Sequence, residues 1–243
     1  MDVFSGKGAL VTGGSRGIGR AVVRRLAADG AEVVFSYRDD DAAAERVAEE
    51  TGALAVRADV GDRAALERLF AAAESRLPGL DILVNNAAGM TGKKLITDIT
   101  DDEYERVFAV NTRAVFLAIQ WAGRVMRDGG RIVNVSTLNT KISAPTLALY
   151  QGSKAAIEQF AMVAARELGG RGITANTVSP GATDTDMLHS ANPPGAAERM
   201  IPLTALGRLG RPDDIAAVVA FLAGPDGRWI TGQNLLATGG MIL

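Results

Sequence analysis

The sequence of 243 residues contains no cysteine and only one histidine. Without cysteine the chain can form neither a disulfide nor a thiolate nucleophile. With one histidine, a zinc site would have to take most of its ligands from carboxylates, which is an unusual set. We therefore expect no metal centre and no thiol chemistry.

An excess of charge of one sign is also missing. The 26 Lys and Arg residues face 28 Asp and Glu residues, which gives a formal net charge of −2, and the basic residues form no block. This argues against a nucleic-acid surface. No apolar run is long enough to span a membrane, and Met1–Lys7 lacks the apolar core of a signal peptide. We expect a cytoplasmic protein with neither nucleic acid nor membrane as a partner.

What the sequence does contain is an alternation of short apolar runs with amphipathic helical segments. This pattern indicates βαβ units, and hence a Rossmann-type, doubly wound parallel sheet of about seven strands with helices on both faces. Neither a linker nor a repeat divides the chain, so we expect one α/β domain over residues 1–243, with an irregular flap at 182–207. The predicted strands are 8–12, 32–38, 53–57, 80–84, 131–137, 173–178 and 234–237, and the predicted helices are 18–29, 40–51, 62–77, 101–127, 150–164 and 211–222.

A glycine-rich turn follows the first predicted strand. Gly13, Gly17 and Gly19 stand between that strand and a helix. Free backbone N–H groups and the helix dipole meet at such a turn, and glycine lets the backbone approach a pyrophosphate closely. A plain tight turn is the alternative, but three glycines placed between a strand and a helix favour nucleotide binding.

The second strand ends in Ser36, Tyr37 and Arg38, where an NAD site would carry an acidic residue for the ribose 2′-hydroxyl. Arg38 and, from the glycine turn, Arg16 would suit a 2′-phosphate, because a guanidinium binds phosphate in a forked geometry. The alternative is that both arginines are solvated surface charges. We expect NADP in preference to NAD.

Tyr150 and Lys154 lie four residues apart on a predicted helix and so share one face. A lysine ammonium beside a phenol favours the phenolate, so we expect Lys154 to lower the pKa of Tyr150. The pair is then a candidate proton donor to a carbonyl oxygen. Taken alone, the spacing equally fits a half-buried tyrosine beside a solvated lysine. The motifs all fall at carboxyl ends of predicted strands, where parallel sheets bind ligands, and this agreement favours a functional site.

Together these motifs resemble the short-chain dehydrogenase/reductase family over essentially the whole chain. Within that family the sequence is most similar to 3-oxoacyl-[acyl-carrier-protein] reductases, which share their general pattern with many other ketone reductases. The residues that carry the resemblance are Thr12–Gly19, Ala58–Val60, Asn85–Ala87, Asn111, Tyr150 with Lys154, Pro180–Gly181 with Thr185, and Ile230–Gln233.

The resemblance implies a role for each matching position. Tyr150 would protonate the carbonyl oxygen, Lys154 would hold the nicotinamide ribose, and Asn111 would hold a relay water. Asp59 would accept from the adenine amino group, and Thr185 would contact the phosphate on the nicotinamide side. The implied cofactor-binding set is Gly13, Ser15, Arg16, Gly17, Ile18, Gly19, Arg38, Asp59, Val60, Asn86, Ala87, Tyr150, Lys154, Pro180, Gly181, Thr183 and Thr185.

The chain departs from the family pattern at two places. Thr137 stands where the family usually has its catalytic serine; its hydroxyl can make the same hydrogen bond, but its methyl group narrows χ1. Ser136 is a poor substitute, because neighbouring strand residues face opposite sides. The second departure is Asn85–Gly89, where the additional alanine is either an insertion or a replacement of glycine.

These observations favour an NADPH-dependent reductase that turns a ketone, such as a 3-oxoacyl thioester or a polyketide-type ketone, into a secondary alcohol. The alternatives are a non-catalytic NADP-binding sensor or scaffold, an NAD-dependent alcohol dehydrogenase and, with little support, a methyltransferase-like domain. The resemblance also implies a homotetramer. The candidate substrate residues are apolar or lie in the flap: Leu138, Leu147, Met187 and His189.

Overall fold

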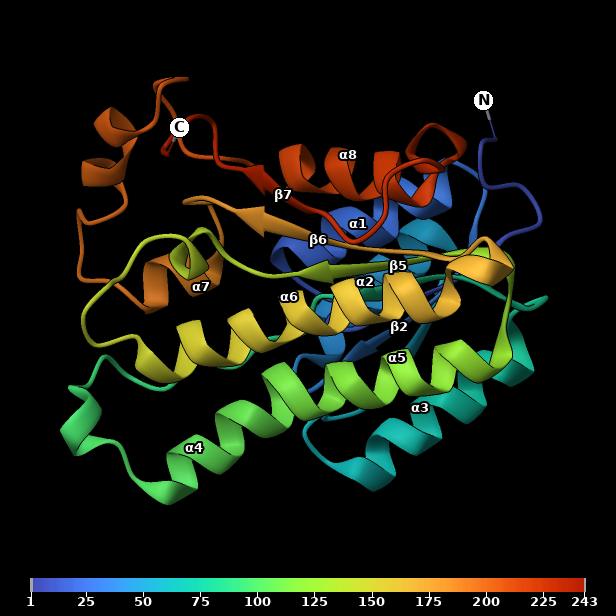
Figure 1. The fold of residues 1–243 in the computed structure, drawn as a ribbon, viewed down its shortest axis with the longest axis horizontal. Helices are drawn as coiled ribbons and strands as arrows, with labels where there is room; N and C mark the ends of the chain where they lie inside the picture. Colours follow the sequence, from blue (N-terminus) through green and yellow to red (C-terminus); the bar gives the residue numbers. More distant parts are fainter. Residues whose placement is uncertain (1, 243) are drawn as a thin grey trace.

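Seven parallel strands form one sheet in the order β3-β2-β1-β4-β5-β6-β7, as Figure 1 shows for the computed structural model, which describes residues 2–242. The predicted doubly wound sheet is therefore confirmed. The order reverses between β1 and β4, and such a reversal opens a crevice at the carboxyl ends of the strands. The strands are β1 Gly8–Val11, β2 Glu32–Tyr37, β3 Leu54–Arg57, β4 Leu80–Asn85, β5 Met126–Val135, β6 Thr174–Pro180 and β7 Asn234–Ala237.

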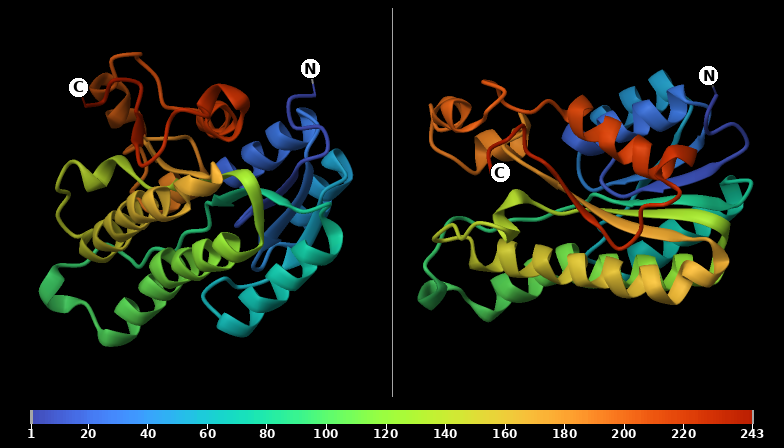
Figure 2. Two further views of the ribbon diagram at one scale, coloured as in Figure 1. Left: turned by 45° about the vertical axis from the view of Figure 1, so that its right-hand side comes forward. Right: turned by 45° about the horizontal axis from the view of Figure 1, so that its top comes forward.

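Helices cover both faces of the sheet, with α1, α2 and α8 on one face and α3, α5 and α6 on the other (Figures 1 and 2). Neighbouring strand residues consequently enter different cores: Val11 and Val33 pack on the first face, and Leu10 and Val34 on the second. This explains why the strands are continuous apolar runs. The helices are α1 Gly17–Ala28, α2 Asp41–Thr51, α3 Arg63–Arg76, α4 Asp101–Phe108, α5 Ala114–Val125, α6 Ala148–Leu168, α7 Asp186–Ser190 and α8 Pro212–Ala223.

Side chains cap the starts of several helices as the sequence predicts. Asp62 accepts a hydrogen bond from the backbone N–H of Ala65 at the start of α3. Thr100 and Glu103 form a reciprocal capping box at the start of α4. The start of α1 differs, because Arg16 at its cap position makes no side-chain hydrogen bond to the helix.

Three predicted boundaries are wrong. The helix predicted over 101–127 is divided by a π-helical turn, Ala109–Arg113, into α4 and α5. The strand predicted over 131–137 begins at Met126 and ends at Val135, so Ser136 and Thr137 lie in the loop that follows. The flap at 182–207 is not irregular throughout, since it contains α7 and a 3-10 turn, Glu198–Leu203.

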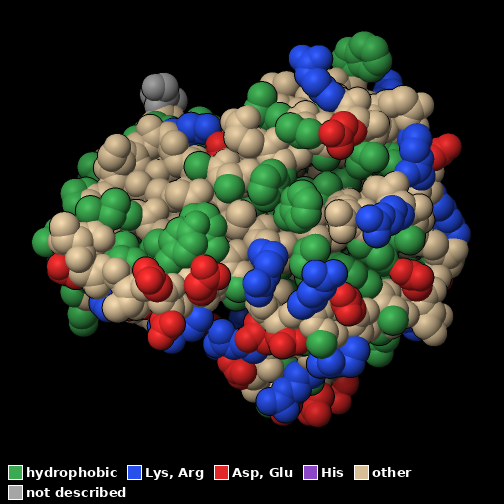
Figure 3. Space-filling view, turned by 60° about the horizontal axis from the view of Figure 1, so that its bottom comes forward, with side chains coloured by type: hydrophobic (Ala, Val, Ile, Leu, Met, Phe, Trp, Pro, Cys, Tyr) green, Lys and Arg blue, Asp and Glu red, His purple; other side chains and the backbone are tan. Residues whose placement is uncertain are grey.

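The outer face of the long helices is partly apolar. Figure 3 shows hydrophobic side chains gathered across the middle of this face. The exposed large hydrophobic residues on α4, α5 and α6 are Tyr104, Phe116, Val125, Met162 and Val163. Within residues 2–242, no helix has the length and apolar character to cross a membrane.

Candidate active site

Tyr150 lies in the first turn of α6, at the carboxyl ends of the strands, and Thr137 lies two residues beyond β5. The two hydroxyl groups are hydrogen-bonded to each other. Burial raises the pKa of Tyr150 above its ordinary value, and the hydrogen bond with Thr137 opposes that rise without cancelling it. A phenol with a raised pKa stays protonated near neutral pH, which is the state that a proton donor needs.

Lys154 is buried within α6, and its Nζ donates to the backbone carbonyl of Val135 at 2.7 Å. Burial lowers the pKa of Lys154 to about 8. The prediction that Lys154 lowers the pKa of Tyr150 is wrong for this structure, because the ammonium is directed at the end of β5 and the pKa of the phenol is raised. An ammonium group has three N–H donors. Within residues 2–242 only one is used, so two remain for a ligand.

Asn111 lies in the π-helical turn and is fully buried. Its amide oxygen accepts from the backbone N–H of Gly89 at 2.7 Å, and its amide nitrogen donates to the Gly89 carbonyl and to the Ser153 hydroxyl. Ser153 in turn donates to the Tyr150 carbonyl at 2.9 Å. Both N–H groups of Asn111 are thus used, one on the loop after β4 and one on the start of α6. A relay water would have to bind an oxygen of this residue instead.

Sequence analysis missed Ser153. The only signal available was its position between Tyr150 and Lys154, on the helix that carries both. Its buried hydroxyl links the π-helical turn to α6, so it belongs to the same network as the predicted residues.

The glycine turn brings β1, β4 and the start of α1 together. Gly13 has a φ of +70°, and a Cβ on Gly19 would lie 2.0 Å from the Gly13 carbonyl oxygen, so both positions require glycine. The Asn86 side chain donates to the carbonyls of Thr12 and Gly13 and holds the turn against the end of β4. The first turn of α1 has neither a capping side chain nor an acidic residue. Its free N–H groups suit an anion such as a pyrophosphate, so this end of the sheet fits a dinucleotide.

The two arginines expected to hold a 2′-phosphate are exposed and lie against aspartates. Arg16 is 4.0 Å from Asp40 and from Asp186, and Arg38 contacts Asp39 at 2.5 Å. The contact with Asp40, which caps α2, places Arg16 beside the loop that carries Arg38. Each guanidinium thus has acidic neighbours that would compete with a phosphate for it.

The remaining predicted cofactor residues surround this turn. Asp59 accepts from the backbone N–H of Gly61 at 2.9 Å, which is turn chemistry. Thr185 caps α7 and lies over the glycine turn, since a Cβ on Gly17 would be 3.3 Å from its methyl group. The other members also lie in or next to the carboxyl-end loops: Ser15, Ile18, Val60, Ala87, Pro180, Gly181 and Thr183.

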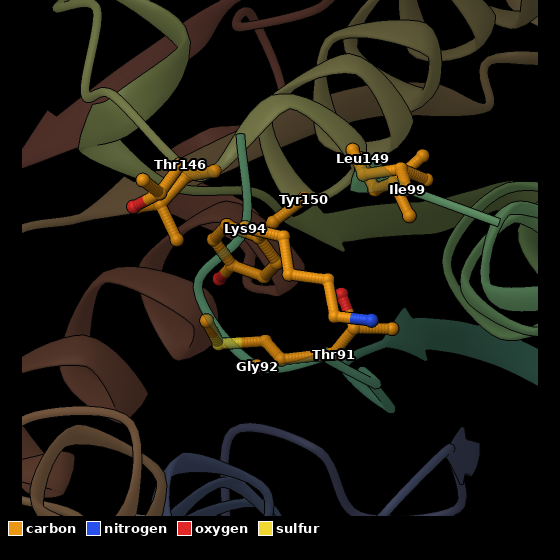
Figure 4. A pocket seen from close by; sticks show the side chains of 9 residues that line it. Thr91, Gly92, Lys94, Ile99, Thr146, Leu149 and Tyr150 are labelled. Atoms are coloured by element: carbon orange, nitrogen blue, oxygen red, sulfur yellow. The ribbon is translucent and has the colours of Figure 1, made fainter. Parts of the chain in front are cut away.

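A shallow hollow lies beside Tyr150. Figure 4 shows Thr146 on one side of it, Ile99 and Leu149 on the other, and the Lys94 side chain extending across it. The residues that line it are Met90, Thr91, Gly92, Lys94, Ile99, Thr146, Leu147, Leu149 and Tyr150.

Among the predicted substrate residues, Leu147 lines this hollow. Leu138 is buried and does not line it, and Met187 is exposed on α7. His189 pairs with Asp184 at 2.7 Å on the surface, which agrees with a solvated residue and not with a substrate contact. The structure therefore does not place Leu138, Met187 or His189 in the hollow.

Lys94 and Thr146 are among the lining residues that sequence analysis missed, because they come from loops distant in sequence. The backbone N–H of Lys94 donates to the Thr146 carbonyl, and its Nζ donates to Glu103 at 2.6 Å. Hydrogen bonds from Lys94 and Thr100 lower the pKa of Glu103 to about 2. Thr146 has a φ of 71°, the one positive φ outside glycine in the described chain. A β-branched residue is strained in that region, and such strain collects at functional sites.

Comparison with known proteins agrees with this geometry. A family model described as enoyl-(acyl carrier protein) reductase matches residues 13–242. An uncharacterized oxidoreductase of Methylorubrum extorquens is 42% identical over 99% of this chain and all of its own length. A hydroxynaphthalene reductase-like protein of Metarhizium brunneum is 41% identical, over 98% of this chain and 96% of its own.

Solved structures give the same picture. A blue fluorescent protein from a metagenomic library, crystallised with NADPH, superposes with a TM-score of 0.93 at 41% identity, covering 99% of each chain. An angucycline C-6 ketoreductase with bound NADP has a TM-score of 0.91 at 41% identity, covering 98% of this chain and 96% of its own. With a family model that spans nearly the whole sequence and relatives of this identity, the chain belongs to the short-chain dehydrogenase/reductase family.

Proposed function

We propose that this protein is an NADPH-dependent reductase that converts a ketone into a secondary alcohol. The observation that carries the proposal is that a neutral phenol and a buried ammonium lie at the same edge of the sheet as the glycine turn. Tyr150 shares a hydrogen bond with Thr137, and Lys154 keeps unused donors within the described chain. A site for nucleotide phosphates and a site for an acid catalyst thus meet at one edge of the sheet.

The chain's own residues would divide the work. When bound, the dihydronicotinamide supplies a hydride to the carbonyl carbon. Tyr150 gives its proton to the carbonyl oxygen, and Thr137 donates a second hydrogen bond that orients this oxygen. Lys154 holds the ribose hydroxyls with its free N–H groups. Because Asn111 and Ser153 fix the start of α6, these groups are positioned before the substrate arrives, which lowers the entropic part of the barrier.

For the cofactor we propose NADP. Arg16 and Arg38 flank the end of β2, and the two solved relatives described above hold NADPH or NADP. A 2′-phosphate would replace the aspartate contacts of these arginines with bidentate hydrogen bonds. Removal of either guanidinium should weaken the binding of NADPH more than the binding of NADH.

For the substrate we propose a compact ketone with an apolar body. Met90, Ile99, Leu147 and Leu149 give the hollow an apolar lining, while Thr91 and Thr146 offer hydroxyl groups. The names of the relatives, a hydroxynaphthalene reductase-like protein and an angucycline ketoreductase, support a ring ketone. A 3-oxoacyl thioester remains the second candidate substrate.

The test is NADPH oxidation by the purified protein with a bicyclic aromatic ketone, an acetoacetyl thioester and a crotonyl thioester, with NADH in parallel. Turnover of a ketone with NADPH in preference to NADH supports the proposal. Turnover of the crotonyl thioester alone would assign reduction of a carbon–carbon double bond instead. Tight NADPH binding without any turnover would indicate a non-catalytic NADP sensor. Oxidation of alcohols with NAD would indicate an NAD-dependent alcohol dehydrogenase.

We also propose a homo-oligomer, with a tetramer as the expected size. The exposed apolar residues on α4, α5 and α6, together with Phe221, Trp229 and Leu236 near the C-terminal edge, give two candidate faces. Light scattering on the purified protein measures the mass directly, and a monomer at micromolar concentration would contradict this proposal.

A further inference from the structure

Glu158 continues the face of α6 that carries Tyr150 and Lys154, since the three residues are spaced by four. Its side chain is buried, and none of the roles described above involves it. A buried carboxylate is costly unless hydrogen bonds satisfy it. Its partners therefore show what the residue holds in place.

Three donors reach the Glu158 carboxylate from the loop after β5. The Ser136 and Thr140 hydroxyls donate to Oε1 at 2.7 and 2.5 Å, and the Lys141 ammonium donates to Oε2 at 2.9 Å. Burial raises the pKa of Glu158, but the hydrogen bonds from Lys141, Thr140 and Ser136 outweigh that effect and leave it lowered. The carboxylate is thus charged and fully engaged.

These donors stand on both sides of Thr137. Ser136 precedes it, and its backbone N–H makes the last hydrogen bond to β6, with the Val178 carbonyl. Thr140 follows it, and the Thr140 hydroxyl also lies 3.0 Å from the Thr137 carbonyl, so its single proton is shared between this carbonyl and the Glu158 carboxylate. The Thr137 hydroxyl itself accepts from the backbone N–H of Asn139. Beyond the sheet, the position of Thr137 therefore depends on this short turn and on what anchors the turn.

We propose that Glu158 is a positioning residue that fixes Thr137 against Tyr150. The carboxylate fastens the turn to the helix that carries the proton donor, so the two hydroxyl groups that face the carbonyl oxygen keep their relative position. The threonine needs this support because its χ1 is restricted and cannot adjust to a displaced backbone. This inference rests on the proposed function, since it assigns Thr137 to the reacting carbonyl.

The main test is a double-mutant cycle in the reductase assay. Glu158→Gln keeps the size of the side chain and removes its charge, and Thr137→Ala removes the hydroxyl through which Glu158 would act. We expect Glu158→Gln to lower kcat roughly tenfold to a hundredfold, with the KM for NADPH unchanged. In the Thr137→Ala background the same change should cost less than twofold. Full additivity of the two losses would overturn the proposal.

A second measurement does not depend on turnover. Tyrosinate absorbance is followed against pH, and the Tyr150→Phe titration is subtracted to isolate Tyr150. Because the Thr137 hydrogen bond lowers the pKa of Tyr150, Thr137→Ala and Glu158→Gln should both move that pKa upward. A shift with Thr137→Ala and none with Glu158→Gln would overturn the inference. If the wild-type protein reduces no ketone, the proposed function fails while this titration still decides the role of Glu158.

Control variants separate positioning from general damage to the helix. Glu167→Gln changes an exposed glutamate on the same helix and should alter neither kcat nor the Tyr150 titration. If Glu158→Gln does not fold, Thr140→Val replaces it. This near-isosteric change removes the hydroxyl proton that Glu158 and the Thr137 carbonyl share, and the same two effects are expected at smaller size.

Discussion

Two buried charges, one at each end of the sheet, have opposite surroundings. At the amino ends of the strands, the buried Asp81 carboxylate accepts from the Lys7 ammonium, the Gly8 N–H and the Arg127 guanidinium, at 3.0, 3.0 and 3.2 Å. At the carboxyl ends, the buried Lys154 ammonium has one carbonyl partner within residues 2–242 and a pKa set by burial alone. One charge is satisfied by the protein, and the other is left for a ligand. Stability is therefore concentrated at the amino ends and binding capacity at the carboxyl ends.

Tyr150→Phe should break the function of the carboxyl end most completely. The change removes the proton donor and little else, so we expect kcat to fall by about a factor of 10³ while NADPH still binds. Steady-state kinetics and fluorescence titration of NADPH measure the two effects. Retained turnover would contradict the assignment of Tyr150 as the acid.

Lys154→Met should stabilise the protein and inactivate it. The fall of the lysine pKa from 10.5 to about 8 corresponds to ~3 kcal/mol at neutral pH. Loss of the hydrogen bond to the Val135 carbonyl destabilises the variant by ~1 kcal/mol, so we expect the unfolding free energy to rise by roughly 2 kcal/mol. Urea denaturation measures this change in unfolding free energy. A variant less stable than the wild type would contradict the inference that the Lys154 ammonium is unsatisfied in the folded protein.

The same residue gives a pH signature. Because the folded pKa of Lys154 lies below its unfolded value, the unfolded chain binds more protons between pH 8 and 10.5. The contribution of Lys154 to the unfolding free energy should therefore rise with pH in that window. Comparison with Lys154→Met, which lacks this contribution, isolates it from other titrating groups.

Asp81→Asn, at the amino ends of the strands, should destabilise the protein without reducing its activity. Asparagine cannot neutralise Lys7 and Arg127, whose side chains are about half exposed and so partly rescued by water. We expect a loss of about 1.5 kcal/mol in unfolding free energy with unchanged kcat. A substantial loss of kcat in the folded variant would mean that the two ends are not separable.

Thr146→Gly should have the smallest effect and tests whether strain at the hollow serves binding. Glycine adopts a positive φ without strain, which relieves about 1–2 kcal/mol, and the more flexible unfolded chain offsets part of this. We expect a net stabilisation of about 0.5–1 kcal/mol and a raised KM for the ketone, because the side of the hollow that faces Ile99 and Leu149 becomes less ordered. An unchanged KM would mean that the strain has no role in substrate binding.

Patterns of local origin were predictable from the sequence. Asp62 and Thr100 predict the starts of α3 and α4 correctly, because a helix cap depends only on residues close in sequence. The parallel arrangement of the strands follows from the alternation of strands and helices, whereas their order does not. The direction of the Lys154 side chain was not predictable, since helical spacing places two residues on one face without telling which atoms the ammonium reaches.

The hollow was the least predictable part. Lys94 and Thr146 meet through a backbone hydrogen bond between two loops that carry no periodic pattern. Leu138, chosen for its apolar side chain, serves the protein interior instead. An apolar residue near a catalytic motif can face a substrate or the core, and only tertiary packing distinguishes the two.

The π-helical turn at Ala109–Arg113 constrains the number of residues between the start of α4 and the start of α5. A π-helical turn holds one residue more than an α-helical turn of nearly the same rotation, so deletion of one residue here would restore a regular helix, keep α4 and α5 in nearly the same orientation and remove the bulge that carries Asn111. Asn111 could then no longer reach both Gly89 and Ser153. Among homologous sequences, gaps of a single residue should therefore be excluded between Thr100 and the start of α5, whereas the loop before Thr100 is free to vary in length.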